Sequence, residues 1–402
     1  MKAKMIVMLF AFLLAGSLIA ADGSYNSKDP CKQVADKEQN KACKEKYLAF
    51  DLCTHNYRKC NFGTLGDSQT DEYQGHANLA GLNWVEQLVQ ARGLDFGGFE
   101  DDPEVRGEPR NDGYAYNFAR WGASATEPTW AEAIPWCSPG GVCVGKSHLF
   151  QAIPHFSAQL EGLTPLVAAG KVQVVTIGFG ANDIFIYRTF GGNFSGNTLP
   201  WYESISAGII ARIAGAVDTL QAAGPVMIVA ARVPALAAWG EAAAAAIGQT
   251  NTQLAAELAM RGVPLIDTRA FFNDPNLLRF TSSGIDLMVG NYAMPIVPWS
   301  VAKVSDLVEP GDPRAIGPCR IVGPEWRDAV DTSNLMCGTL EYQLNAVLDD
   351  GIHPSTLAMG LMANEYVKAF NSTYGLKIRP LTIEEILDAA GIVEPEEEDD
   401  GD

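Results

Sequence analysis

The sequence predicts an α/β protein of three layers, in which helices cover both faces of a central, mostly parallel sheet. The first observation is that short apolar runs alternate with amphipathic stretches of ten or more residues, a pattern typical of parallel sheets. The second is the run from Val172 to Ile177, which is rich in β-branched residues and has a glycine close to each end, as expected for a buried strand. The third is that three helical stretches stop at a glycine, namely Gly170, Gly224 and Gly262.

Each predicted element follows from its local pattern. Short apolar runs predict strands at 62–65, 115–119, 172–177, 225–231 and 263–266. Helical periodicity predicts helices at 83–92, 148–169, 201–223, 242–261 and 356–374. Residues 274–337 have weak periodicity and many prolines and glycines, which predicts a long irregular insertion near the rim of the functional site.

The N-terminus has the pattern of a secretory signal peptide over residues 1–21. Lys2 and Lys4 precede an apolar run that ends at Ala20 and Ala21, and a polar segment follows. An uncleaved membrane anchor is the alternative, but the run is slightly short for a full span. We therefore expect a protein that is secreted, periplasmic or on the cell surface, with no stable membrane insertion after cleavage.

Eight cysteines in an exported chain predict disulfides. Residues 22–60 are polar and cysteine-rich, and we expect a small helical cap in which Cys31, Cys43, Cys53 and Cys60 pair in one of three connectivities. The other four cysteines form local couples, Cys137 with Cys143 and Cys319 with Cys337. A zinc site is the alternative, but neither a C-x2-C nor an H-x3-H spacing is present.

Composition and charge exclude several classes of function. The 402 residues are 47% hydrophobic and 19% charged, which is typical of a globular protein. The formal net charge is −19, and the C-terminal extension at 376–402 ends in an acidic tail with seven acidic residues from Glu394 to Asp402. Nucleic-acid binding depends on Lys and Arg that neutralise phosphates, so we expect no nucleic-acid partner.

Three segments carry polar groups where predicted strands or loops end. Ser68 follows Gly66 and Asp67, Asn182 lies in a Gly-x-Asn-Asp sequence after the strongest strand, and His353 follows Asp350 by three residues. In an open parallel sheet the carboxyl ends of the strands form the ligand-binding edge. Each segment alone has an ordinary alternative, which is a capping turn, a Gly-Asn turn or a loop with an exposed histidine. Together they supply a nucleophile, an amide donor and an oriented base.

With these motifs the chain resembles the SGNH hydrolase superfamily, also called GDSL esterases and lipases. Residues 66–68, 180–183 and 350–354 match its first, third and last blocks, and Gly122 within 117–124 matches the second. The resemblance covers residues 61–375 and implies a flavodoxin-like fold. Gln69 departs from the apolar residue that the family often has after the serine.

The resemblance implies a catalytic triad and an oxyanion hole. Ser68 would be the nucleophile, His353 the base, and Asp350 the group that orients the histidine. The backbone N–H groups of Ser68 and Gly122 and the side chain of Asn182 would stabilise the oxyanion. No metal or cofactor is required. The other four histidines have no partner spacing and are interpreted as structural or surface residues.

The expected function is hydrolysis of carboxylic esters through an acyl-enzyme. The substrate would be a small-molecule or polysaccharide ester, with a lipid, small acyl or carbohydrate O-acetyl group. Two alternatives stay open. One is an acyltransferase that uses the same triad with a sugar or alcohol as acceptor, and the other is a non-catalytic surface binding protein on the same fold.

Overall fold

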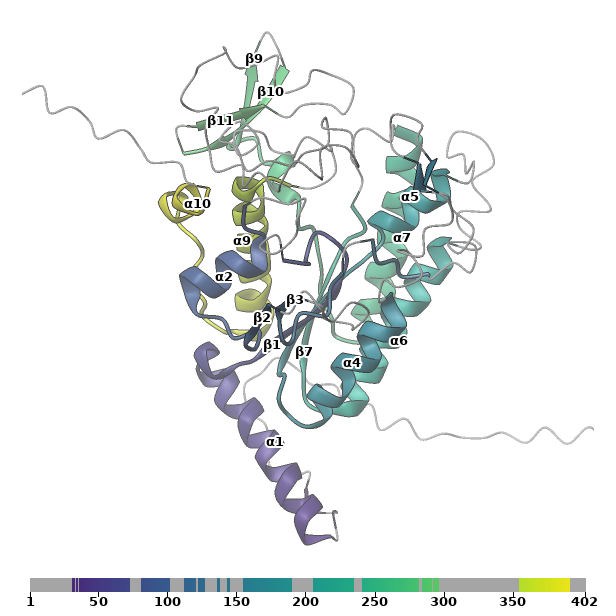
Figure 1. The fold of residues 1–402 in the computed structure, drawn as a ribbon, viewed down its shortest axis with the longest axis vertical. Coiled ribbons are helices and arrows are strands. Elements are labelled where there is room, and N and C mark those ends of the chain that lie inside the picture. The colour runs from purple at the N-terminus through teal and green to yellow at the C-terminus, as the bar shows by residue number, and fades with distance from the viewer. Residues whose placement is uncertain are drawn as a thin grey trace, which may run out of the picture.

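The computed structural model has three layers, with helices on both sides of a parallel sheet (Figure 1). It describes residues 31–32, 34, 36–72, 81–101, 112–120, 122–126, 136–137, 143–144, 155–189, 205–234, 241–281, 284–290, 292–295 and 354–390. The predicted signal peptide and acidic tail lie outside these ranges.

The central sheet contains four parallel strands in the order β1-β6-β7-β8. Their bounds are β1 (Phe62–Gly66), β6 (Val174–Gly178), β7 (Met227–Ala231) and β8 (Leu265–Ile266). The predicted strand at 115–119 is reduced to a parallel bridge between Asn117 and Thr64. Thr64 N–H donates to the Tyr116 carbonyl and Phe118 N–H donates to the Thr64 carbonyl, both at 3.1 Å. This segment therefore extends the sheet beyond β1.

Alternate side chains along the strands separate the core into two apolar clusters. Phe62 and Val174 face one cluster, while Leu65 and Val175 face the other. The first cluster packs under α2 (Trp84–Arg92), α9 (Thr356–Tyr374) and α10 (Ile383–Ala389), and the second packs under α4 (Phe156–Ala168), α6 (Ala207–Ala223) and α7 (Glu241–Ala259). The period of two in a strand produces this division, and it confirms the predicted three-layer fold.

The helix ends follow local capping rules. Asn83 caps α2 through a capping box with Glu86, and Gly93 ends the helix at a φ of 63°. Ser355 caps α9, which has the predicted bounds. Within the described residues, α4 begins at Phe156 and α6 at Ala207, and both end within a residue of the predicted positions.

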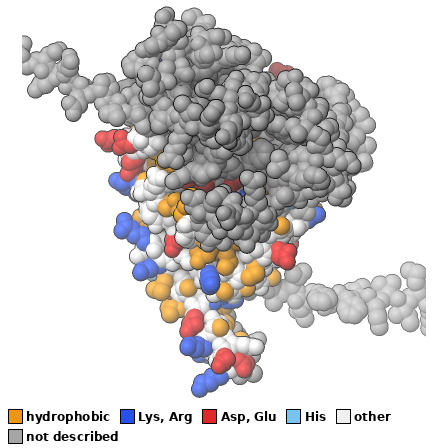
Figure 2. All heavy atoms as spheres, in the orientation of Figure 1, with side chains coloured by type: hydrophobic (Ala, Val, Ile, Leu, Met, Phe, Trp, Pro, Cys, Tyr) orange, Lys and Arg blue, Asp and Glu red, His pale blue; other side chains and the backbone are white. Residues whose placement is uncertain are grey.

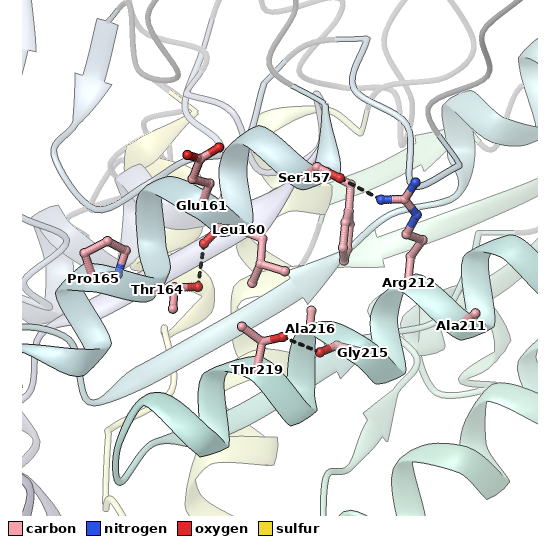
Figure 3. A pocket seen from close by; sticks show the side chains of 11 residues that line it. Ser157, Leu160, Glu161, Thr164, Pro165, Ala211, Arg212, Gly215, Ala216 and Thr219 are labelled. Atoms are coloured by element: carbon pink, nitrogen blue, oxygen red, sulfur yellow. Dashed lines mark hydrogen bonds between the residues drawn. The ribbon is translucent and has the colours of Figure 1, made fainter.

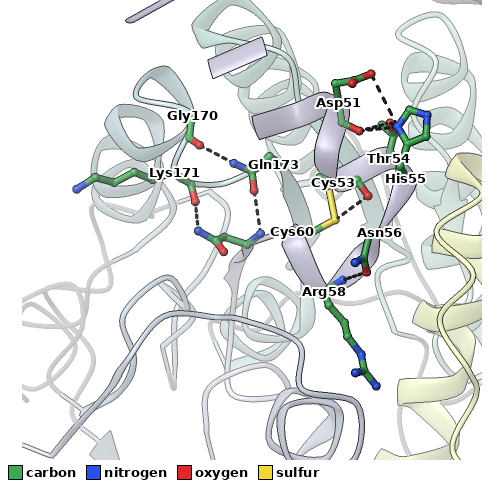
Figure 4. Close-up of a disulfide and its surroundings, with 11 residues drawn as sticks. Asp51, Cys53, Thr54, His55, Asn56, Arg58, Cys60, Gly170, Lys171 and Gln173 are labelled. Atoms are coloured by element: carbon green, nitrogen blue, oxygen red, sulfur yellow. Dashed lines mark hydrogen bonds and ion pairs between the residues drawn. A yellow bond between two sulfur atoms is a disulfide. The ribbon is translucent and has the colours of Figure 1, made fainter. Parts of the chain in front are cut away.

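The N-terminal segment is helical and joined to the core by a disulfide. Helix α1 (Lys37–His55) projects from the body of the molecule, and both acidic and basic side chains line it (Figures 1 and 2). The disulfides are Cys31–Cys43 and Cys53–Cys60, which is one of the three expected connectivities. Figure 4 shows the second one beside Gln173, whose side chain accepts the backbone N–H of Asn61 at 2.8 Å.

The expectation of a wholly irregular insertion at 274–337 is wrong at its start. Strands β9 (Leu278–Thr281), β10 (Gly284–Val289) and β11 (Tyr292–Pro295) form an antiparallel sheet beyond the carboxyl ends of the parallel strands (Figure 1). Leu287 and Val289 are fully buried and alternate with the half-buried Met288. Because each strand is only four to six residues long, the periodicity was too short to stand out from the surrounding turns.

Two short hairpins complete the described structure. Strand β2 (Phe99–Asp101) pairs with β3 (Asp112–Tyr114), and β4 (Trp136–Cys137) pairs with β5 (Cys143–Val144). The second register places Cys137 opposite Cys143, which is compatible with the predicted couple. Cys319 and Cys337 lie outside the described residues. Across the helices that are described, none combines the length and apolar character needed to span a bilayer.

Candidate active site

Ser68 lies in a tight turn directly after β1. The N–H groups of Thr70 and Asp71 both donate to the Asp67 carbonyl at 3.0 Å, and Gln69 N–H donates to the Asp67 carboxylate at 3.1 Å. We call residues 67–71 the Ser68 turn. Ser68 itself is only 6% exposed. The turn therefore fixes the serine at the carboxyl edge of the sheet.

The end of β1 is held on two sides by hydrogen bonds to Gly66. The buried Gln159 amide of α4 accepts from Gly66 N–H and donates to Gly66 O, both at 2.9 Å. Arg120 N–H also donates to Gly66 O at 3.1 Å. A Cβ at position 66 would lie 3.2 Å from the Gly178 carbonyl oxygen, so glycine permits this close approach of β1 and β6.

The segment that carries Gly122 is bonded to the start of helix α5 (Ala181–Thr189). Gly122 has a φ of 76°, and Ala123 N–H donates to the Arg120 carbonyl at 3.0 Å. The Asn182 amide donates to Ala123 O at 2.8 Å. This bond uses one of the two amide hydrogens, and within the described residues the other has no acceptor. The Asn182 amide thus lies next to the Gly122 segment, and its second N–H bonds to none of the described residues.

Asp183 is hydrogen-bonded to the same loop. Its fully buried carboxylate accepts Ala125 N–H at 2.9 Å, Thr126 N–H at 2.8 Å and the Thr126 hydroxyl at 2.6 Å. Burial raises the pKa of Asp183, and the hydrogen bonds from Thr126 and Ala125 oppose that rise. We call residues 122–126 the Gly122 loop. Three bonds to one carboxylate make this loop and α5 a single unit.

His155 also contacts the Gly122 loop. It is the N-cap residue of α4, and its Nδ1 accepts the Ser124 N–H at 3.2 Å. The sequence predicted a structural or surface role for this histidine, and the structure gives it a structural one. Its place next to the loop was not visible in the spacing, because 31 residues separate the two partners.

A layer of buried amides supports the Ser68 turn. Asn83, the cap of α2, donates to the carbonyls of Thr70 and Asp71 at 3.0 and 2.7 Å. Asn117 donates to Thr70 O at 2.8 Å. The main-chain carbonyls at the end of the turn are thereby satisfied although the turn is buried.

Charged groups lie in the same layer. Asp71 and Arg120 form an ion pair at 3.2 Å, with side chains 5% and 8% exposed. Glu72 is next to them and accepts Tyr114 N–H at 2.9 Å. Burial raises the pKa of Glu72 to about 8, and the Asp71 charge adds to that rise while Arg120 lowers it. Burial thus favours the neutral form of Glu72.

The predicted His353 and Asp350 lie outside the described residues, and the described chain resumes at Pro354. Thr356, the first residue of α9, accepts Leu82 N–H at 3.1 Å and Gln87 Nε2–H at 2.8 Å. Both donors flank Asn83, which bonds to the Ser68 turn. The start of α9, three residues after His353, and the Ser68 turn thus contact the same end of α2.

Two hollows are lined by described residues. One lies at the carboxyl ends of the strands, beside the Ser68 turn, and Gln69, Phe179, Arg232, Met362 and Tyr366 contribute to its lining. The other is a shallow groove between α4 and α6, where Arg212 donates to the Ser157 hydroxyl at 2.6 Å (Figure 3). Only the first adjoins Ser68. In the described ranges, no group of three His, Cys, Asp or Glu side chains is arranged to hold a metal ion.

Comparison with known proteins agrees with the motifs. A family model described as GDSL-like Lipase/Acylhydrolase matches residues 62–366. Among solved structures, the chain is similar to the Clostridium thermocellum family 3 carbohydrate esterase, with a TM-score of 0.35 and 13% identity over 80% of this chain and 99% of that one. No curated protein matches the chain.

Proposed function

Since the chain belongs to the GDSL-like lipase/acylhydrolase family and is, in general terms, an ester-cleaving hydrolase, we propose that it is a secreted serine esterase with Ser68 as nucleophile. His353 is the base and Asp350 orients it. The oxyanion hole consists of the Asn182 amide and the N–H groups of Ser68 and Gly122. Its substrates are carboxylic esters of small molecules or polysaccharides.

The observation that carries this proposal is a chain of hydrogen bonds at one edge of the sheet. Arg120 N–H bonds to Gly66, next to the Ser68 turn, and Asn182 bonds to Ala123, next to Gly122. Three segments from separate parts of the sequence therefore adjoin one another. Their polar groups are those that acyl transfer needs, which are a hydroxyl and several N–H donors for the developing charge.

The proposed reaction has two halves. His353 takes the proton from Ser68 Oγ as that oxygen attacks the ester carbonyl, and the carbonyl oxygen gains negative charge opposite the Asn182 amide. The tetrahedral intermediate collapses, the leaving alcohol receives the proton from His353, and an acyl group stays on Ser68. Water, activated by the same histidine, then releases the acid. The contacts of Thr356 with the end of α2 support a position of His353 near Ser68.

The location of the protein is part of the proposal. Disulfides persist in oxidising compartments, so the Cys31–Cys43 and Cys53–Cys60 bonds support export through the signal peptide at 1–21. Mass spectrometry of the mature protein would test this. We expect an N-terminus near residue 22, and an intact Met1 on the exported form would contradict it.

The test of the nucleophile is Ser68→Ala with p-nitrophenyl acetate as substrate. We expect kcat to fall by about 10⁶-fold, since the acyl-enzyme cannot form. Ser157→Ala is the matched control because Ser157 is an exposed serine on α4, and it should keep full activity. A fluorophosphonate should label the wild type and Ser157→Ala but not Ser68→Ala. Full esterase activity in Ser68→Ala would overturn the assignment.

A further inference from the structure

Arg120 joins the two segments that the proposed reaction depends on. Its main-chain N–H bonds to Gly66, two residues before Ser68, and its own position is two residues before Gly122. Its side chain turns back to Asp71, the last residue of the Ser68 turn. Arg120 therefore bonds to the residue before the Ser68 turn and to the last residue of that turn. It also lies two residues before the Gly122 loop.

The side-chain hydrogen bonds that Arg120 makes to described residues all come from one nitrogen. Nη1 donates to Asp71 Oδ1 at 3.2 Å and to the carbonyls of Asn117 and Ala119. These carbonyls belong to the edge segment that leads into Gly122. The guanidinium thus bonds simultaneously to the Ser68 turn and to the segment beside it, and its planar shape fixes their separation.

The cluster is not arranged for stability alone. Within the described residues, three buried atoms of this cluster have no hydrogen-bond partner, namely Arg120 Nε, Arg120 Nη2 and Glu72 Oε2. A buried polar group without a partner destabilises the fold, and apolar side chains of similar size are often as stable as a buried ion pair. A buried guanidinium with incomplete hydrogen bonding is expected where its position is needed for function.

The charges in the cluster balance one another. Asp71, Glu72 and Arg120 are the charged groups that face each other, with Tyr114 adjoining Glu72. Because burial favours the neutral form of Glu72, one carboxylate and one guanidinium remain. Among the described residues, Asp71 is the ionic partner of Arg120.

We propose that Arg120 is a positioning residue for ester hydrolysis, whose bonds to Asp71 and Gly66 hold the Ser68 turn and the Gly122 loop at the separation required for attack and oxyanion binding. This inference rests on the proposed function. It assigns Arg120 no contact with substrate. Its effect is on how far Ser68 Oγ lies from the Gly122 N–H when the carbonyl carbon is attacked.

The experiment measures kcat and KM for p-nitrophenyl acetate in Arg120→Met, Arg120→Lys and Asp71→Asn. The concentration of active sites is determined by titration with a fluorophosphonate, and kcat is expressed per titrated site. A misplacement of about 1 Å costs on the order of 100-fold, so we expect kcat to fall by about 10- to 100-fold in Arg120→Met while KM changes by less than about threefold. Arg120→Lys keeps the charge and should recover part of the loss. Asp71→Asn is nearly isosteric and serves if Arg120→Met does not fold.

Coupling and a remote control separate positioning from simple destabilisation. Arg120→Met and Asp71→Asn should be non-additive in kcat, because both break one ion pair. Arg92→Met breaks a buried ion pair elsewhere and should leave kcat per titrated site unchanged. If the Arg120 and Asp71 variants keep wild-type kcat per titrated site while Ser68→Ala is inactive, this inference fails and the proposed function stands. If Ser68→Ala is fully active, the proposed function fails first.

Discussion

Two buried arginines in this molecule are used in opposite ways. Arg92, the last residue of α2, donates from Nε to Arg379 O, from Nη1 to Ala91 O and Glu385, and from Nη2 to Pro380 O and Glu385. These bonds engage all five guanidinium hydrogens. In the part of the chain that the structure describes, the Arg120 side chain donates from Nη1 alone, and its Nε and Nη2 have no partner. Both side chains are nearly inaccessible, at 2% and 8% exposure.

The difference teaches what each pair is for. Arg92 lies at the end of α2 away from the Ser68 turn and joins this helix to α10, so complete satisfaction there contributes stability. Arg120 lies in the layer under the Ser68 turn, where hydrogen bonding is incomplete. Proteins tend to violate local rules at functional sites and to compensate elsewhere. The predictions below test whether the completeness of hydrogen bonding, rather than burial or charge, distinguishes the region around Arg92 from the region around Arg120.

The largest effect is expected at Asp183, whose buried carboxylate accepts three hydrogen bonds from the Gly122 loop. In Asp183→Asn the amide NH2 would face N–H donors, and the Gly122 loop would lose at least one bond. We expect a loss of about 4 kcal/mol in the free energy of unfolding, together with a fall in kcat. Urea unfolding followed by fluorescence measures the first quantity.

Asp388→Asn is the control for Asp183→Asn. It removes a carboxylate from α10, on the opposite face of the sheet, and should change neither stability nor kcat appreciably. Wild-type stability in Asp183→Asn would mean that the three bonds to the Gly122 loop are dispensable. It would contradict the view that complete hydrogen bonding of buried groups determines stability.

Arg92→Met should have the next largest effect, and on stability alone. It removes a donor from three backbone carbonyls and leaves Glu385 with Arg379 as its remaining arginine partner, so we expect a loss of about 3 kcal/mol. The Arg92 guanidinium lowers the pKa of Glu385 to about 2. That contribution is present above the unfolded value of 4.5 and is lost as the pH falls towards 2.

The pH dependence distinguishes the ion pair of Arg92 from simple packing. The stability difference between wild type and Arg92→Met should be constant from pH 6 to 8 and should shrink below about pH 4. Differential scanning calorimetry over this range measures it. A difference that is independent of pH would indicate that Arg92 stabilises through its aliphatic part, and a fall in kcat at pH 7 would remove the contrast with Arg120.

The sequence predicted the fold where long periodic segments dominate. Helix α9 has the predicted bounds, and the four strands of the parallel sheet lie within a residue or two of their predicted positions. The matching family model confirms the resemblance that rested on residues 66–68 and 180–183. These features are local in sequence, so hydrophobic period and motif spacing suffice to find them.

The supporting contacts could not be predicted in the same way. Arg92 and Glu385 are 293 residues apart, and Arg120 and Asp71 are 49 apart. No spacing rule connects such partners, because the fold and not the chain brings them together. Asn117 and Arg120 do lie in the block that contains Gly122, and this proximity is the one signal that pointed to them. The short strands β9 to β11 were missed for lack of length.

Glu72→Gln should show a smaller effect that grows with pH. The native state holds the Glu72 proton until about pH 8, whereas the unfolded chain loses it near 4.5. The native state therefore binds more protons between these values, and the stability of the wild type falls as the pH rises. The glutamine variant lacks this fall. We expect it to gain about 2 kcal/mol relative to wild type between pH 5 and 8, which is below the limit of about 4 kcal/mol that one proton sets over three pH units.

Urea unfolding at several pH values would measure this gain. The two proteins should have similar stability near pH 4, where Glu72 is protonated in both states. A difference that stays constant from pH 4 to 8 would mean that Glu72 is not held neutral by the fold. In that case the charge balance around Arg120 would need a different explanation.

The smallest effect is expected at an ion pair that is neither buried nor fully bonded. Lys41 and Glu45 face each other on α1 at 3.8 Å, with side chains 78% and 65% exposed. Exposed pairs gain little because water and salt screen them, so Lys41→Ala should shift the unfolding midpoint by no more than about 1 °C. Calorimetry at low and high salt measures the shift. A larger, salt-dependent change would show that an exposed charge on α1 contributes to stability. Complete hydrogen bonding of buried groups would then be only one of two sources of electrostatic stability in this protein.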